Sequence, residues 1–445
     1  NWFLAATICL AFGQTTHAGS VYWDTNSTAA GSGAATGTWG SSAFWSTDST
    51  GATATTATLP TANDDVFIAA GTNGTTGTIT IDTTKVAGSV TIQEPAANPG
   101  VIISGGTSLT LGGGSSASKG LFVTGNGTHT VSTPLILNGA NTSQNAGTGL
   151  LSITGGVSGT GDLTARNNSA TAPGISILGL PVSITGGISN TGTNGSINIG
   201  NANGASTTGG LGSGVTSVTQ DGVSNLVFIN SDNSLFAGNY NIVSGTLQWA
   251  GTNASGAITK TNSASVINLG ATSGANAASL NIVNNAVSGK VNNNINVRAG
   301  STGTKSITLN SSVSFATTGE IILDDNLTLN PNTVNFGITL NGLVKDGVSG
   351  PKGIVKSGVG DLTLSAANSF SGSTTLTNGN LILTGSSGAL PSTSGVSITG
   401  GTFRLNNTAA ANNGNRMPDS TVITMTGGTL DFKNDAVAAT SYSET

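Results

Sequence analysis

The chain has 445 residues and a formal net charge of −5, and only 7% of its residues are charged. Globular proteins carry about 25% charged residues, so ordinary globular domains do not fit this composition, and Ser, Thr and Asn must face the solvent instead. Disorder does not fit either, because 36% of the residues are hydrophobic and the net charge is small. With 13 Lys and Arg against 18 Asp and Glu, the composition argues against nucleic acid as a partner.

The first residues have the pattern of a secretion signal. A short apolar run over residues 2–12 leads into small residues, which predicts a signal peptide over residues 1–18, cleaved after Ala18. The run is too short to span a membrane, and a buried N-terminal strand is the alternative. Because the initiator Met and a basic leader are absent, we expect the sequence to begin inside its gene. The single cysteine, Cys9, falls in this segment, so the mature chain would contain no cysteine for disulfides or metal binding.

Large aromatic residues gather in the next segment, over residues 19–70. Trp23, Trp39 and Trp45 lie here, together with Tyr22 and Phe44. Stacked β-structure leaves an apolar end that must be covered, and large rings cover it efficiently. We therefore predict an N-terminal capping region. A sugar-binding platform is the alternative, with the three tryptophans as carbohydrate contacts.

From residue 71 onward the chain is built of short segments in which apolar and small polar residues alternate. Residues 79–81, 90–92, 109–111 and 135–137 are examples, and most such segments are followed by Gly or Asn. A period of two predicts strands with one buried face, and Gly and Asn suit the corners between them. We predict an all-β fold, with a parallel β-helix, or β-solenoid, over residues 71–445 and no helix.

Asparagines are frequent at the predicted corners. Asn138, Asn141, Asn190 and Asn194 are examples. Two interpretations remain open for them. They either stack as internal amide ladders between coils or stand exposed as ordinary turn residues.

The clearest repeats lie at residues 353–405, with a degenerate copy at 218–250. The first reads G-x-G-x-L-x-L from Gly358, then N-x-F-x-G-x-T-x-L from Asn368, then G-x-L-x-L from Gly379. This spacing resembles the autotransporter-associated beta-strand repeat of secreted and surface proteins from Gram-negative and related bacteria. The resemblance implies a right-handed, single-stranded parallel β-helix and secretion across the cell envelope. The motif describes a coil of backbone and not a chemical site.

Residues for catalysis or metal binding are scarce. Parallel β-helices also host polysaccharide lyases and glycosidases, which need clustered carboxylates, often with Arg, Lys or Ca²⁺. The candidate catalytic residues are Asp324, Asp325 and Arg298, and solvated corner charges are the competing interpretation. His129 is the only histidine beyond the signal segment, and a single His in a strand is usually structural. No metal-binding or phosphate-binding motif occurs, so we expect no cofactor and no metal site.

These observations favour a secreted or cell-surface structural or adhesive β-solenoid, similar to an autotransporter passenger, with no catalysis. We expect glycans or cell-surface molecules as partners and no membrane span in this fragment. Any association with an outer membrane would run through a part beyond residue 445. An extracellular polysaccharide lyase or glycosidase is the alternative function, and a purely architectural sheath is a third.

Overall fold

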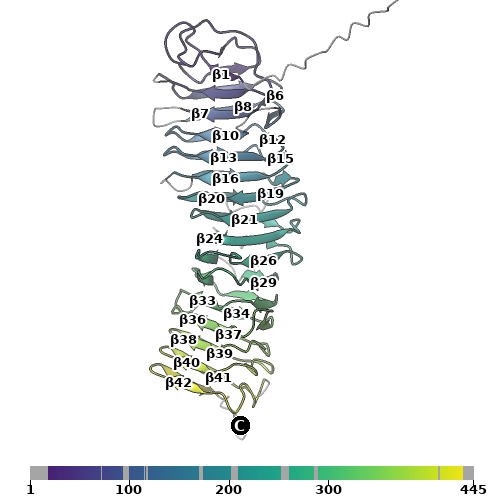
Figure 1. Ribbon diagram of the computed structural model, residues 1–445, viewed down its shortest axis with the longest axis vertical. Coiled ribbons are helices and arrows are strands. Elements are labelled where there is room, and N and C mark those ends of the chain that lie inside the picture. The colour runs from purple at the N-terminus through teal and green to yellow at the C-terminus, as the bar shows by residue number, and fades with distance from the viewer. Residues whose placement is uncertain are drawn as a thin grey trace, which may run out of the picture.

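The computed structural model describes residues 19–71, 73–93, 100–114, 116, 119–169, 174–201, 209–251, 260–284, 289–408 and 411–433. The predicted signal peptide and its cleavage site after Ala18 lie outside these residues. Every regular element described is a strand, so within these ranges no helix is present that could cross a membrane. The described strands stack into an elongated column (Figure 1), and β43 (Thr429–Lys433) is the last of them in the sequence. This column is a parallel β-solenoid of about 14 turns, which confirms the predicted fold class.

The strands lie on three faces, here called faces 1, 2 and 3, and follow one another in that order along the chain, although some turns have no strand on one of the faces. Face 1 consists of β1 (Ser20–Trp23), β4 (Asp65–Ile68), β7 (Ser89–Ile92), β10 (Gly120–Val123), β13 (Asn141–Asn145), β16 (Leu163–Asn167), β19 (Gly187–Asn190), β21 (Ser217–Asp221), the first part of β24 (Asn239–Gly251), β26 (Val266–Leu269), β29 (Asn294–Val297), β32 (Ile321–Leu323) and β35 (Val344–Asp346). Face 2 consists of β2 (Gly37–Trp39), β5 (Gly77–Ile81), β8 (Val101–Gly105), β11 (His129–Val131), β14 (Leu151–Ile153), β17 (Ile175–Leu178), β20 (Ser196–Gly200), β22 (Asn225–Ile229), the second part of β24, β27 (Ala278–Asn284), β30 (Lys305–Leu309), β33 (Leu327–Pro331), β36 (Ile354–Lys356), β38 (Thr374–Leu376), β40 (Val396–Ile398) and β42 (Ile423–Met425).

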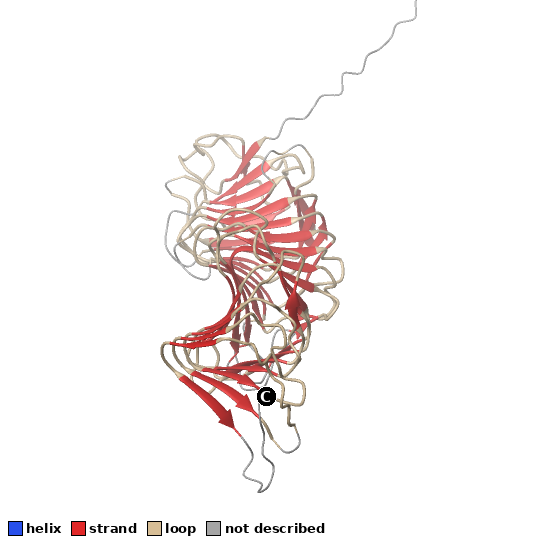
Figure 2. Ribbon diagram, turned by 60° about the horizontal axis from the view of Figure 1, so that its bottom comes forward, coloured by secondary structure: helices blue, strands red, loops and turns tan. Residues whose placement is uncertain are grey.

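Face 3 is built in sections that occupy the same place in successive turns. Its first section contains β6 (Thr84–Ala87), β9 (Ser108–Leu111), β12 (Leu135–Asn138), β15 (Val157–Thr160) and β18 (Val182–Ile184). The short strands β23 (Asp232–Asn233) and β25 (Lys260–Thr261) pair with each other in the middle of the chain. The last section contains β28 (Gly289–Val291), β31 (Phe315–Thr317), β34 (Gly337–Leu340), β37 (Asp361–Leu364), β39 (Asn380–Leu383), β41 (Thr402–Asn406) and β43. Figure 2 shows the strands of the solenoid stacked on one another, with loops at the corners between them.

The core is a continuous stack of inward side chains that runs along the axis. On face 1, Val66, Val90 and Leu121 are in register in successive turns, and none of them is exposed. The alternation of the strands turns these residues inward and their neighbours outward. One turn alone could not bury its apolar side chains, so each turn depends on the turns above and below it.

The N-terminal end carries an aromatic cluster, as expected for the cap. Strand β3 (Trp45–Ser46) pairs antiparallel with β1, which ends the parallel stacking there. The ring of Trp45 packs edge-on against Trp23 and Trp39, with centroids 4.9 and 5.1 Å apart. The three tryptophans are at most 1% exposed, so their rings pack in the core and offer little surface to a sugar. β1 and β2 already pair in parallel with β4 and β5, so part of this segment forms the first turn.

Both interpretations of the corner asparagines occur. Asn190 is fully buried and donates through its amide to Oε1 of Gln220 in the next turn, at 2.7 Å. Asn141 is buried too, but its amide donates within its own turn. Asn138 and Asn194 are exposed. Asn190, the last residue of β19, therefore takes the internal role, whereas Asn138 and Asn194 are exposed corner residues.

Candidate functional site

The first part of the repeat predicted at residues 353–405 contains four strands, which together make two successive passes over faces 2 and 3. Its chain runs through β36 on face 2, β37 on face 3, an irregular corner, and then β38 and β39 on faces 2 and 3. β36 pairs with β38, and β37 pairs with β39, so both ends of the unit lie one rung apart. The leucines of the motif are fully buried. The leucines of the unit therefore pack in the core between one turn and the next.

A buried lysine holds the first corner of this unit. Lys356 is fully buried at an inward position of β36, and its ammonium group donates to three backbone carbonyl groups. The acceptors are the carbonyl oxygens of Ser357, Gly358 and Asn378, at 2.7, 2.9 and 2.9 Å. Asn378 belongs to the next turn, so the lysine ties two turns together. Burial lowers the pKa of Lys356 to about 8, an effect that the nearby charge of Asp361 opposes.

A buried asparagine and a phenylalanine fill the second corner. The Oδ1 atom of Asn368 accepts the backbone N–H of Val344 in the preceding turn at 3.0 Å. Its Nδ2 atom donates to the carbonyl oxygen of Ala389 in the following turn at 3.3 Å. Asn368 and Phe370 are both fully buried. One amide thus satisfies backbone groups above and below it, where no strand is present to do so.

Residues 354–383 match the family model of the passenger-associated-transport-repeat. The chain carries this repeat. The match confirms the resemblance drawn from the spacing of glycines, asparagine and leucines. No curated protein matches the chain, and no solved structure does.

The degenerate copy at 218–250 uses the same corner chemistry as the passenger-associated-transport-repeat. Asn233 is fully buried, and its Oδ1 atom accepts the backbone N–H of Leu211 in the preceding turn at 3.0 Å, as Asn368 does for Val344. Phe236 is fully buried, like Phe370. The backbone φ of Gly245 is 69°, and that of Gly379 is 65°. The two units therefore share these local contacts, although Gly245 lies between faces 1 and 2 and Gly379 between faces 2 and 3.

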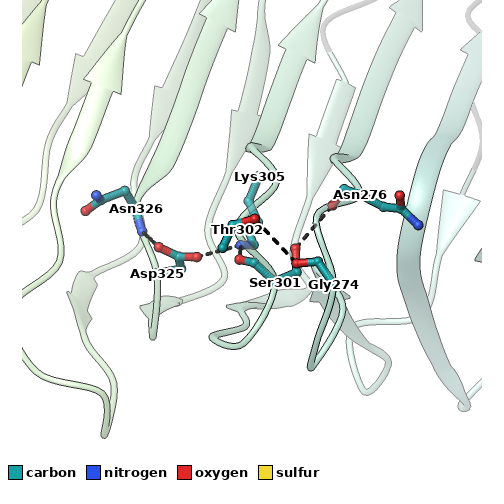
Figure 3. A network of polar contacts seen from close by, with 7 residues as sticks. All are labelled: Gly274, Asn276, Ser301, Thr302, Lys305, Asp325 and Asn326. Atoms are coloured by element: carbon teal, nitrogen blue, oxygen red, sulfur yellow. Dashed lines mark hydrogen bonds and ion pairs between the residues drawn. The ribbon is translucent and has the colours of Figure 1, made fainter.

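The candidate catalytic carboxylates, Asp324 and Asp325, bind groups at the corners of their own and neighbouring turns. Asp325 accepts from Nζ of Lys305 at 2.5 Å, and Lys305 is only 1% exposed (Figure 3). Lys305 also donates to the carbonyl oxygen of Ser301, and Asp325 accepts the backbone N–H of Asn326 at 2.8 Å. The carboxylate of Asp325 is therefore held by a buried lysine at the turn, as Figure 3 shows.

The other charged candidates are placed in similar contacts. Asp324 accepts the backbone N–H of Ser349 at 2.9 Å, and among the described residues no ion pair joins Arg298 to Asp324 or Asp325. Lys345 pairs with Glu320 at 2.7 Å. Hydrogen bonds to corner backbone therefore account for the position of the predicted carboxylates.

His129 takes a structural position. It is fully buried in β11, and its Nδ1 atom accepts the backbone N–H of Val101 at 3.0 Å, so Nδ1 is not protonated. Burial lowers the pKa of His129 to about 4. Across the described ranges, no three His, Cys, Asp or Glu side chains come together as a metal-binding group.

Sequence reasoning missed the buried cations. Lys305 and Lys356 occupy inward strand positions, and Arg416 is fully buried with its guanidinium donating to Asn407 Oδ1 at 2.6 Å and to corner carbonyl groups. The signal was present in the alternation, because Ile354 and Lys356 flank an outward residue and therefore share the inward side.

Proposed function

We propose that this protein is a secreted or cell-surface passenger whose solenoid acts as a stiff structural and adhesive rod, without catalysis. The passenger-associated-transport-repeat at residues 354–383 carries the proposal. It lies within the stacked parallel turns, so the unit that resembles transported passengers is part of the rod itself.

The construction of the rod supports this role. Strands in successive turns pair above and below, so the backbone is stiff along the axis, and the outer surface is made largely of Ser, Thr and Asn. A rod of this kind can hold several weak binding sites in fixed positions, and simultaneous contacts then raise the avidity. The carboxylates of Asp324 and Asp325 are engaged at corners, which favours a structural use of these groups.

Localisation is the direct test of the passenger role. Antibodies against the folded solenoid are applied to intact cells that produce the protein naturally, and the culture medium is assayed in parallel. We expect labelling of intact cells or release into the medium, and digestion by protease added outside the cells. Protein that is reached only after lysis would overturn the proposal.

A second assay separates adhesion from catalysis. The purified chain is offered a panel of extracellular polysaccharides and cell surfaces, with binding and new reducing ends measured together. Binding without turnover supports adhesion, and turnover would replace it with the polysaccharide lyase or glycosidase function.

A further inference from the structure

Half-buried aromatic side chains lie in one file on the outer surface of face 1. Tyr22, Phe67, Thr91, Phe122 and Gln144 are in register in five successive turns. All five are half-buried and point outward, opposite the core residues between them. Tyr22 stacks on Phe67, with ring centroids 4.9 Å apart and planes 17° from parallel. In a chain with only 4% aromatic residues, this alignment is not a product of composition.

A groove of about 280 Å³ lies along this file. It is lined by Asp65, Phe67, Ser89, Thr91, Phe122, Thr124 and Gln144. The strands involved are β4, β7, β10 and β13, of which β7, β10 and β13 lie one below another in Figure 1. With rungs about 4.8 Å apart, Phe67 and Phe122 stand roughly 10 Å apart across the small side chain of Thr91.

The polar side of the groove is held in place. Asp65 Oδ1 accepts from the hydroxyl groups of Ser89 at 2.6 Å and Ser116 at 2.7 Å. Gly120 is in register with Ser89, and because it has no side chain, the surface beside Phe122 is hollowed there. A Cβ atom there would lie 1.8 Å from the carbonyl oxygen of Thr142, and the φ of Gly120 is 136°, so only glycine fits.

We propose that this groove binds a neutral, extended glycan, with Phe67 and Phe122 as stacking surfaces and Asp65 and Gln144 as hydrogen-bonding groups. The C–H face of a sugar ring packs on an aromatic ring, while its hydroxyl groups at the rim donate to a carboxylate or an amide. The residues that line the groove include one carboxylate and no Lys or Arg, which disfavours acidic glycans. The inference deepens the adhesive role proposed above and depends on it for its biological setting.

Other occupants fit the groove less well. An extended peptide that adds a strand needs an open sheet edge, but β7 is paired on both sides, with β4 and β10. Lipid would require a wider apolar surface than one stacked pair of rings and a third ring beside hydroxyl groups.

Calorimetry with defined oligosaccharides tests the proposal. The purified full chain is titrated with neutral hexasaccharides of β-linked glucose, xylose and mannose, and with hexagalacturonate as the acidic probe. We expect at least one neutral hexasaccharide to bind and hexagalacturonate not to bind. Phe67→Ala and Phe122→Ala should each weaken that binding by about tenfold, as the loss of a stacking ring in a binding site commonly does.

The matched control is Phe336→Ala, which removes another half-buried ring, just before β34 and many turns from the groove, and should leave binding unchanged. Circular dichroism of each variant reports whether it folds. The proposal is overturned if no neutral hexasaccharide binds the wild-type chain, if the acidic probe is preferred, or if the control loses as much affinity as the groove variants. Surface labelling of the same variants keeps the two proposals apart, because a groove variant that loses the sugar should still reach the cell surface.

Discussion

At the scale of single residues, buried cations replace the missing partners of corner carbonyl groups. A solenoid turn interrupts the ladder of backbone hydrogen bonds at each corner, and carbonyl groups there must find other donors. Lys356 and Arg416 bring several donors each through the core on long stems, and both are fully buried. An ammonium group taken from water costs free energy, which its hydrogen bonds must offset. These cations are therefore expected to matter more for folding than surface charges do.

We predict that Lys356→Met destabilises the protein by about 2–4 kcal/mol, because the stem is kept while three buried carbonyl oxygens lose their donor. Lys345→Met is the control, since Lys345 and Glu320 form a partly exposed pair that contributes less than about 1 kcal/mol. Urea unfolding of both variants measures the difference. Equal losses would show that the carbonyl contacts of Lys356 do not stabilise the fold.

His129 should make the fold sensitive to acid. Its pKa is about 4 in the fold and 6.5 for the free side chain, so between these pH values the unfolded chain binds a proton that the folded chain does not. The contribution is complete above pH 6.5 and is lost as the pH falls toward 4, by about 3 kcal/mol in total. Hydrogen exchange of β8 and β11 at pH 7 and pH 5, corrected for intrinsic rates, should show more opening at pH 5.

The variant His129→Asn keeps an acceptor for the Val101 N–H and cannot be protonated. Its exchange in β8 and β11 should not respond to this pH change. If wild type and variant respond alike, the acid sensitivity arises elsewhere.

At the scale of the elements, strands follow from the sequence more readily than corners do. Alternation over two to five residues marks most strands, because one face of each strand must be apolar. The alternation does not predict where the chain continues from one face to the next without a corner. β24 runs for 13 residues over faces 1 and 2 without a break, although Gly245 within it suggests a turn. The corners also vary in length. The register between side chains of different turns therefore cannot be read from their spacing in the sequence.

Glycines at corners are constrained by neighbouring turns as well as by their own backbone. Gly379 has a φ of 65°, and a Cβ atom would lie 2.4 Å from the carbonyl oxygen of Gly360. Gly350 has a φ of 87°, but nothing lies within 4 Å of its Cβ position. We predict that Gly350→Ala costs about 1–2 kcal/mol of backbone strain and that Gly379→Ala costs clearly more. Urea unfolding midpoints compare the two, and equal shifts would mean that the neighbouring turn gives way without cost.

At the scale of the whole molecule, function is distributed along an axis. The groove lies near the N-terminal end and the passenger-associated-transport-repeat near the C-terminal end of the described rod (Figure 1). The solenoid and its relation to passengers could be predicted from sequence, because both follow from a local, repeated pattern. The groove could not, since it depends on Phe67 and Phe122 falling in register two turns apart. Local composition favoured the tryptophans as carbohydrate contacts, but Trp23, Trp39 and Trp45 are buried in the core.

A rod in which each turn contacts only its neighbours should not unfold as one unit. The variant with Trp2→Phe and Trp249→Phe leaves Trp23, Trp39 and Trp45 as fluorescent reporters of the N-terminal end, whereas circular dichroism averages all strands. We predict that the two signals give different urea midpoints, because local stabilities differ along the axis. Adding Lys356→Met should lower the midpoint by circular dichroism and leave the fluorescence midpoint in place, since the substituted corner is many turns away. Coincident curves that shift together would instead mean that the coupling between adjacent turns exceeds the differences in their own stability, so that a corner weakened near residue 356 destabilises the whole core.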